Sequence, residues 1–232
     1  MAAFAAEIPF GPQKVISTSE GYGIDVISGD LDGDGDLDLV GIGGTNAPSG
    51  VYWYENLDGK GTMSSAHLID GSSGQLGTPV SIQLVDMDND GDLDLLTGTF
   101  SDCVWYANDG HGHFGARTVV RSDWGFVAFK AADIDGDGDP DVVGVVGYDA
   151  NKIAWFRNNG GGTFNPAAEN FIDALPNGSG EGDVIPADID GDGKIDLVVL
   201  QSTSGDQVAW YRNLGAGAFS AKQTIATFPV IR

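Results

Sequence analysis

The sequence DLDGDGDLD at residues 30–38 decides the fold, because it recurs three more times along the chain. The later copies are DMDNDGDLD, DIDGDGDPD and DIDGDGKID at residues 86–94, 133–141 and 188–196. Their starts are separated by 56, 47 and 55 residues. Self-similarity at a nearly fixed period is typical of repeat architectures. We call each copy an Asp loop and number its residues as positions 1 to 9.

A second motif follows each Asp loop, beginning 19 to 23 residues after the loop begins. Its copies are WYEN, WYAN, WFRN and WYRN at residues 53–56, 105–108, 155–158 and 210–213. A Gly-rich turn and then Phe or Met come next. Apolar residues alternate around both motifs, as in Leu37/Leu39 and Val51/Trp53, which predicts short antiparallel strands rather than helices. We expect four strands per repeat, named a to d, with the Asp loop between a and b and the Trp on c. The d strands are expected at 63–69, 114–120, 164–172 and 219–226.

Units of four strands that recur every 40 to 50 residues are the blades of a propeller. We therefore predict an all-β fold: a β-propeller built of four four-stranded antiparallel blades within a single domain, residues 1–232. The expected repeats are approximately 17–69, 70–120, 121–172 and 173–226. Residues 10–16 resemble an extra d strand ahead of the first blade, so the chain has one outer strand more than four blades need. Either this segment closes a blade in another copy of a homo-oligomer, or it is a fifth strand on an edge, or the chain is part of a longer propeller, so an open or partial ring is one expectation.

The Asp loops carry side-chain oxygens at positions 1, 3, 5 and 9, with Gly at position 6. Alternating oxygens and a Gly turn resemble the beginning of an EF-hand loop, which wraps a hard cation. The bidentate Glu of position 12 is missing, since Gly41 stands there in the first repeat. A strand also follows where an EF-hand needs a helix. We therefore predict calcium-binding ab loops that close β-hairpins.

Calcium suits such loops better than Mg²⁺ or softer metals, because it accepts six to eight flexibly held oxygens. The alternative is four solvated acidic turns, which would not need Gly at position 6 and Asp at position 9 every time. Position 7 holds Lys194 in the last loop, which is consistent with a backbone carbonyl ligand there. The prediction is about four Ca²⁺, held by Asp30, Asp32, Asp34, Asp36, Asp38, Asp86, Asp88, Asp90, Asp92, Asp94, Asp133, Asp135, Asp137, Asp139, Asp141, Asp188, Asp190, Asp192, Lys194 and Asp196.

The Asp loop between two strands, repeated with the Trp motif and the Gly hairpin, resembles the FG-GAP/VCBS repeat family. The resemblance extends from about residue 10 to residue 226. It implies a calcium-loop β-propeller as in integrin alpha-chain heads, fungal propeller lectins and the propeller portions of some secreted carbohydrate-active enzymes. Such relatives are mostly extracellular, so an extracellular or secreted location is expected, with no leader visible at residues 1–10. Function varies widely across the family.

Charge and composition exclude several function classes. The net charge is −23, with 34 acidic and 11 basic residues, so nucleic acid and anionic lipid should repel the chain. No apolar run approaches the length of about 18 residues that spans a bilayer, so no membrane insertion is expected. Cys103 has no partner for a disulfide and is expected to be a small buried hydrophobic residue.

No set of residues in the sequence stands out as a catalytic constellation, so no catalytic residue is assigned. The histidines are His67, on an expected strand, and the pair His111 and His113 in a Gly hairpin. The four motif Trp residues share one strand position with apolar neighbours, which favours packing between blades over sugar stacking.

A ligand is expected on the face opposite the Asp loops, where the irregular bc and da connections gather. The candidate ligand-binding residues are the aromatics of those connections: Tyr22, Phe100, Trp124 and Tyr148. Gap-filling between blades is an equal alternative for Trp124 and Tyr22. The sequence favours a non-catalytic binding module whose partner is a carbohydrate or a protein. The alternatives are the propeller domain of a lyase-like carbohydrate-active enzyme, and a structural or designed fragment that self-assembles.

Overall fold

A computed structural model describes residues 11–18, 23–43, 50–71, 81–99, 101–122, 126–146, 152–175, 182–201 and 207–228. The described residues form strands, turns and extended segments without any helix, and so contain no helix that could cross a membrane. Four antiparallel four-stranded sheets follow one another along the chain, and a short two-stranded hairpin accompanies the last. The predicted all-β class and the four blades are therefore confirmed.

Each blade takes its strands from one repeat, in sequence order. The first blade contains β1 (Gly23–Gly29), β2 (Asp38–Gly43), β3 (Gly50–Tyr54) and β4 (His67–Asp70). The second contains β5 (Ser81–Val85), β6 (Asp94–Gly98), β7 (Cys103–Tyr106) and β8 (Thr118–Arg121). The third contains β9 (Phe126–Ala132), β10 (Asp141–Val146), β11 (Lys152–Phe156) and β12 (Asn170–Ala174). The fourth contains β13 (Gly182–Ala187), β14 (Asp196–Gln201), β15 (Gln207–Tyr211) and β18 (Gln223–Thr227), with the hairpin of β16 (Asn213–Gly215) and β17 (Ala218–Phe219).

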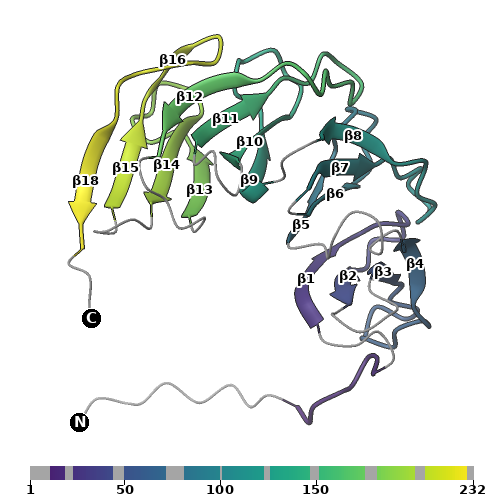
Figure 1. The fold of residues 1–232 in the computed structure, drawn as a ribbon. Coiled ribbons are helices and arrows are strands. Elements are labelled where there is room, and N and C mark those ends of the chain that lie inside the picture. The colour runs from purple at the N-terminus through teal and green to yellow at the C-terminus, as the bar shows by residue number, and fades with distance from the viewer. Residues whose placement is uncertain are drawn as a thin grey trace, which may run out of the picture.

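The four blades lie side by side along an arc that does not close (Figure 1). The first and fourth blades stand at the two ends of this arc. Residues 11–18 form no strand in the described part of the chain, so the additional strand predicted for residues 10–16 is not joined to a sheet there. The protein therefore has the form of an open propeller segment.

The register places every Asp loop and every Gly hairpin at the same end of its blade. Position 9 begins each b strand and pairs with the last residue of the a strand, as Asp38 pairs with Gly29. The d strands begin later than predicted, at His67 in the first blade. The expected start, Met63, forms only an isolated bridge to Asn56, because it closes the hairpin. Stretches of three to five residues therefore separate the hairpins from the outer strands.

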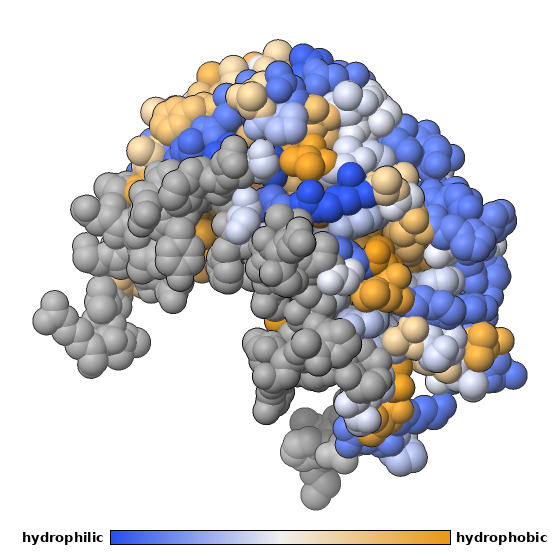
Figure 2. Space-filling view, turned by 45° about the vertical axis from the view of Figure 1, so that its right-hand side comes forward, coloured by the Kyte–Doolittle hydropathy of each residue, from blue (hydrophilic) through white to orange (hydrophobic). Residues whose placement is uncertain are grey.

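Apolar side chains fill the spaces between adjacent blades. The described residues form three hydrophobic clusters, each shared by two neighbouring blades. Trp53, Trp105 and Trp155 are buried in these clusters, which confirms their predicted packing role. Cys103 is also buried and free, and burial raises the pKa of its thiol. Figure 2 shows that the visible outer surface is largely hydrophilic, with separate apolar patches.

Candidate metal sites

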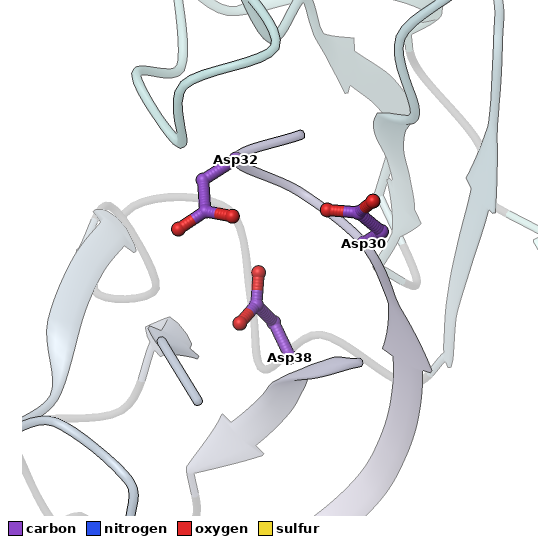
Figure 3. Close-up of side chains that lie close together, drawn as sticks. All are labelled: Asp30, Asp32 and Asp38. Carbon is purple, nitrogen blue, oxygen red and sulfur yellow. The ribbon is translucent and has the colours of Figure 1, made fainter. Parts of the chain in front are cut away.

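Three aspartates gather their carboxylates in every Asp loop. In the first loop they are Asp30, Asp32 and Asp38, and one oxygen from each lies within 4.8 Å of the others. Figure 3 shows the carboxylates of Asp32 and Asp38 facing one another, with that of Asp30 beside them. The other loops gather positions 1 and 3 with position 5 or 9, in the groups Asp86, Asp88 and Asp90; Asp133, Asp135 and Asp141; and Asp188, Asp190 and Asp192. Converging carboxylate oxygens are the donor set that a hard divalent cation prefers.

Backbone amides hold the loops in this curled form. The position 6 amide donates to the position 1 carboxylate at 3.0 Å in all four loops, as Gly35 donates to Asp30. The position 5 amide donates to the position 3 carboxylate at 3.2 Å in each. Position 6 is Gly with φ between 84° and 101°, a region where other side chains are strained. Position 4 also has positive φ, and Asn89, which tolerates it, replaces Gly in the second loop.

The aspartate at position 9 is buried and joins its loop to the following c strand. In the third blade, one oxygen of Asp141 accepts from the amide of Ile134 and the other from the amide of Asn158. The same two bonds form in every blade. Burial raises the pKa of Asp94 to about 6 and that of Asp141 to about 7. A nearby cation would offset that cost by stabilising the charged form.

The side chains at position 7 lie outside the carboxylate groups. Asp36 and Asp92 instead stand against Gly59 and Gly110 of the hairpins, where an added Cβ would come within 2.4 to 2.5 Å of a carboxylate oxygen. Lys194, at the same position, forms an ion pair with Asp192 at 2.8 Å. The predicted contribution of position 7, a backbone carbonyl, is compatible with these orientations and stays a prediction.

Arginine side chains reach into the last two loops. Arg157 lies 3.1 Å from Asp135 and 2.7 Å from Asp137. Arg212 contacts Asp190 and Asp192 in the same way, at 2.5 and 3.0 Å. The hydrogen bond from Arg157 lowers the pKa of Asp137, while burial raises that of Asp135. The guanidinium groups partly neutralise these two loops.

The first two loops have no such neighbour. Glu55 and Ala107 occupy the corresponding position of the Trp motif, and no basic side chain of the described residues forms an ion pair with either loop. Burial is the main cause of a raised pKa at Asp32 and Asp88, and neighbouring carboxylates raise it further. These two loops therefore carry negative charge that no basic side chain of the described residues balances.

The motif asparagines are structural residues whose function sequence reasoning missed. The side-chain amide of Asn108 donates to the carbonyl of Leu31 in the preceding blade at 2.8 Å. Asn158 and Asn213 make the corresponding bonds to Met87 and Ile134. The constant Asn of the Trp motif was the available signal, and its partners lie more than 70 residues away in sequence.

The candidate ligand residues Tyr22, Phe100, Trp124 and Tyr148 lie outside the described residues, so their role stays a prediction. A cleft of about 390 Å³ opens instead on the Asp-loop side, between the third and fourth blades. Its lining includes Asp133, Asp135, Lys194 and Asn213.

The FG-GAP-like repeat family matches the chain at residues 30–97, 98–144, 145–199 and 188–230. The protein therefore belongs to the FG-GAP-like repeat family. No curated protein matches the chain.

Among solved structures, the chain is similar to an Agrocybe aegerita lectin described as specifically recognising non-reducing terminal N-acetylglucosamine. Identity is 26% and the TM-score 0.60, over 86% of this chain and 52% of the lectin. The chain thus spans about half the length of that lectin. The comparison also finds a Photorhabdus luminescens Tc holotoxin pore, with 21% identity and a TM-score of 0.46 over 89% of this chain and 9% of that chain. It further finds the V. cholerae biofilm matrix protein Bap1, with 18% identity and a TM-score of 0.43 over 88% of this chain and 39% of that chain.

Proposed function

We propose that this protein is a calcium-stabilised, non-catalytic binding module of the lectin type. Four Ca²⁺, one per Asp loop, would hold the ab loops in place and fix the ends of the blades. The observation that carries this proposal is the convergence of three carboxylates within 4.8 Å in each of the four loops. Calcium would supply the positive charge that balances them, since carboxylates crowded this closely repel one another.

Carbohydrate is the ligand class that we propose first. The similarity to the Agrocybe lectin supports it, because that protein recognises a terminal sugar. The acidic charge of −23 also fits a neutral glycan better than an anionic polymer. An extracellular or secreted location agrees with this function, since calcium sites of extracellular modules work at about 10⁻⁴ to 10⁻³ M.

The test is glycan-array binding in millimolar calcium, with N-acetylglucosamine-terminated glycans as the first probe and EDTA as the matched control. We expect binding that EDTA abolishes. Cleavage of polyuronates would support the carbohydrate-active enzyme instead. If the protein binds no glycan but binds a protein ligand, it would be an adhesion module instead of a lectin.

Two pairs of variants locate the ligand face. We expect Trp124→Ala with Tyr148→Ala to abolish glycan binding while calcium-dependent stability stays unchanged. His111→Ala with His113→Ala alters a hairpin on the Asp-loop side and should leave binding intact. The reverse outcome would place the ligand on the Asp-loop side, where the cleft between the third and fourth blades lies.

A further inference from the structure

Each internal junction between blades uses one set of residues on its leading blade, which we call the Trp face. In the first blade the Trp face comprises Leu31 at loop position 2, Ile42 on β2 and Trp53 on β3. These side chains are 1%, 2% and 7% exposed, because the second blade covers them. The corresponding side chains of the next two blades are buried in the same way: Met87 and Trp105, then Ile134, Val145 and Trp155.

The fourth blade has the same Trp face, but no blade of this chain covers it. Ile189, at loop position 2, is 48% exposed, and Leu200 on β14 is 43% exposed. Trp210 is only partly buried, and its indole N–H donates to Asp196 of its own blade. In contrast, the indole of Trp105 donates to the carbonyl of Gly162 in the next blade.

The following blade of each junction contributes what we call the receiving face. Its a strand supplies an apolar side chain opposite the third residue after position 9: Ile82, Phe129 or Val184. These are 6%, 2% and 0% exposed. Its hairpin supplies a Gly against the Trp of the leading blade. A Cβ added at Gly112, Gly162 or Gly217 would lie 2.0 to 2.2 Å from that indole.

The first blade has the same receiving face, which no other blade of this chain covers, and residues 14–17 lie beside it. Val26, which pairs with Gly41 in the position of Ile82, is 65% exposed. Gly61 stands two residues before Met63, as Gly112 stands before Phe114. A Cβ at Gly61 would meet nothing closer than the Lys14 ammonium at 4.0 Å. A hollow of about 210 Å³ lies on this face, lined in part by Val26, Leu39 and Tyr52.

One hydrogen bond recurs at every internal junction, and the first and fourth blades each carry one of its two partners without the other. The motif Asn of each following blade donates to the position 2 carbonyl of the leading blade. Among the bonds of the described residues, the side-chain amide of Asn56 donates only to Leu37 of its own blade. The carbonyl of Ile189 accepts no side-chain amide of Asn from the residues that the structure describes. The fourth blade thus presents the acceptor of this hydrogen bond, and the first blade presents the donor.

We propose that two copies of this chain join head to tail and close one eight-bladed ring. The fourth blade of each copy would pack its Trp face on the receiving face of the other copy's first blade. Ile189, Leu200 and Trp210 would be covered as their counterparts are, and Asn56 of one copy would donate to Ile189 of the other. The interface would continue the three junctions already present, because the first and fourth blades stand at the two ends of the open arc in Figure 1.

Charge opposes this association and sets the conditions of the test. Each copy carries −23, and repulsion between two such copies is long-ranged at low salt. Salt at about 0.15 M shortens the Debye length to about 8 Å. The experiment is light scattering after size exclusion, in that salt with millimolar calcium. We expect a measured mass of twice the chain mass of 24.1 kDa.

Charged substitutions on the two faces identify the interface. Val26→Lys and Leu200→Lys should each give a folded monomer, because both side chains are largely exposed in the single chain. The matched control is Phe171→Lys, on the outer strand β12, where Phe171 is 60% exposed. It makes the same change of charge and should stay dimeric. Circular dichroism verifies that every variant is folded.

Mixing Val26→Lys with Leu200→Asp tests the head-to-tail arrangement. The mixed dimer has one unaltered junction and one that pairs Lys with Asp. We therefore expect the mixture to have the mass of two chains. A wild-type monomer at about 100 μM, or a series of masses beyond two copies, would overturn the closed ring. So would a Val26→Lys variant that stays dimeric, or a mixture that stays monomeric.

Discussion

The first two Asp loops and the last two each gather three carboxylates but have different neighbours. Arg157 and Arg212 extend from their own Trp motifs into the third and fourth loops. The corresponding residues in the first half are Glu55 and Ala107. Glu55 adds negative charge and contributes to the raised pKa of Asp32. Similar groups of three carboxylates thus differ in how much of their negative charge the chain itself neutralises.

Calcium removal should have the largest effect on the whole molecule. A ligand that binds only the native state stabilises it by about 2.7 kcal/mol per site at a hundredfold excess over its dissociation constant. We therefore expect the melting temperature to fall by more than about 10 °C in EDTA. Differential scanning calorimetry with and without millimolar calcium measures this. Equal melting temperatures would show that the loops are acidic turns that need no cation.

Loss of the position 9 carboxylate should be the most damaging single change within a loop. Asp141→Ala removes the acceptor of two buried backbone amides, which should cost about 3 kcal/mol even in EDTA. The matched control in the same loop is Asp139→Ala, whose side chain lies outside the carboxylate group and accepts one exposed hydrogen bond, from Asn89. It should cost less than about 0.5 kcal/mol. Urea unfolding compares the two variants, and equal losses would mean that position 9 has no special structural role.

The built-in arginines should protect the second half when calcium is absent. Hydrogen exchange in EDTA should show the first two blades losing protection before the last two. Arg157→Ala should lower protection in the third blade and tighten calcium binding there by roughly fivefold, because it removes a competing charge near the ligands. The control is Arg117→Ala, which pairs with Asp102 away from the Asp loops. Simultaneous loss of protection in all blades would show that the arginines do not stabilise the last two blades in the absence of calcium.

A smaller effect concerns the boundary between the halves. Glu169 pairs with Arg121 of the second blade and Lys152 of the third. Burial raises the pKa of Glu169, but hydrogen bonds from Lys152 and Arg121 outweigh it and lower the pKa overall. A lowered folded pKa stabilises the protein above the unfolded value of about 4.3, and this contribution disappears as pH falls through the folded pKa.

Glu169→Gln should therefore cost about 1 to 2 kcal/mol at pH 7. The difference from wild type should shrink as pH falls below about 4. Unfolding curves across this pH range measure it, with and without calcium. A difference that is constant with pH would show that the pairing is not electrostatic.

The sequence predicts the local parts of this molecule well. All carboxylates of a loop lie within nine residues, so their spacing alone indicates that they converge, and three of them do in each loop. Period-two alternation likewise predicts the strands and the buried positions of Trp53, Trp105 and Trp155.

Contacts between distant residues escape such reasoning. The bond from Asn108 to Leu31 spans 77 residues, and the pairing of Arg157 with Asp137 spans 20. Neither leaves a local pattern, because each depends on how one strand or blade lies against the next. The outer strands begin later than predicted for the same reason, since the hairpin bridge of Asn56 and Met63 depends on folding of the loop.

Counting the bound ions tests directly whether each Asp loop binds one Ca²⁺. The protein would be dialysed against calcium at about 10⁻³ M, freed of excess metal, and measured by native mass spectrometry beside the variants Asp32→Ala and Asp135→Ala. The four carboxylate groups predict four Ca²⁺ per chain and three in each variant. A wild-type protein that binds no calcium, or variants that bind as many ions as the wild type, would contradict the assignment of one calcium site to each Asp loop.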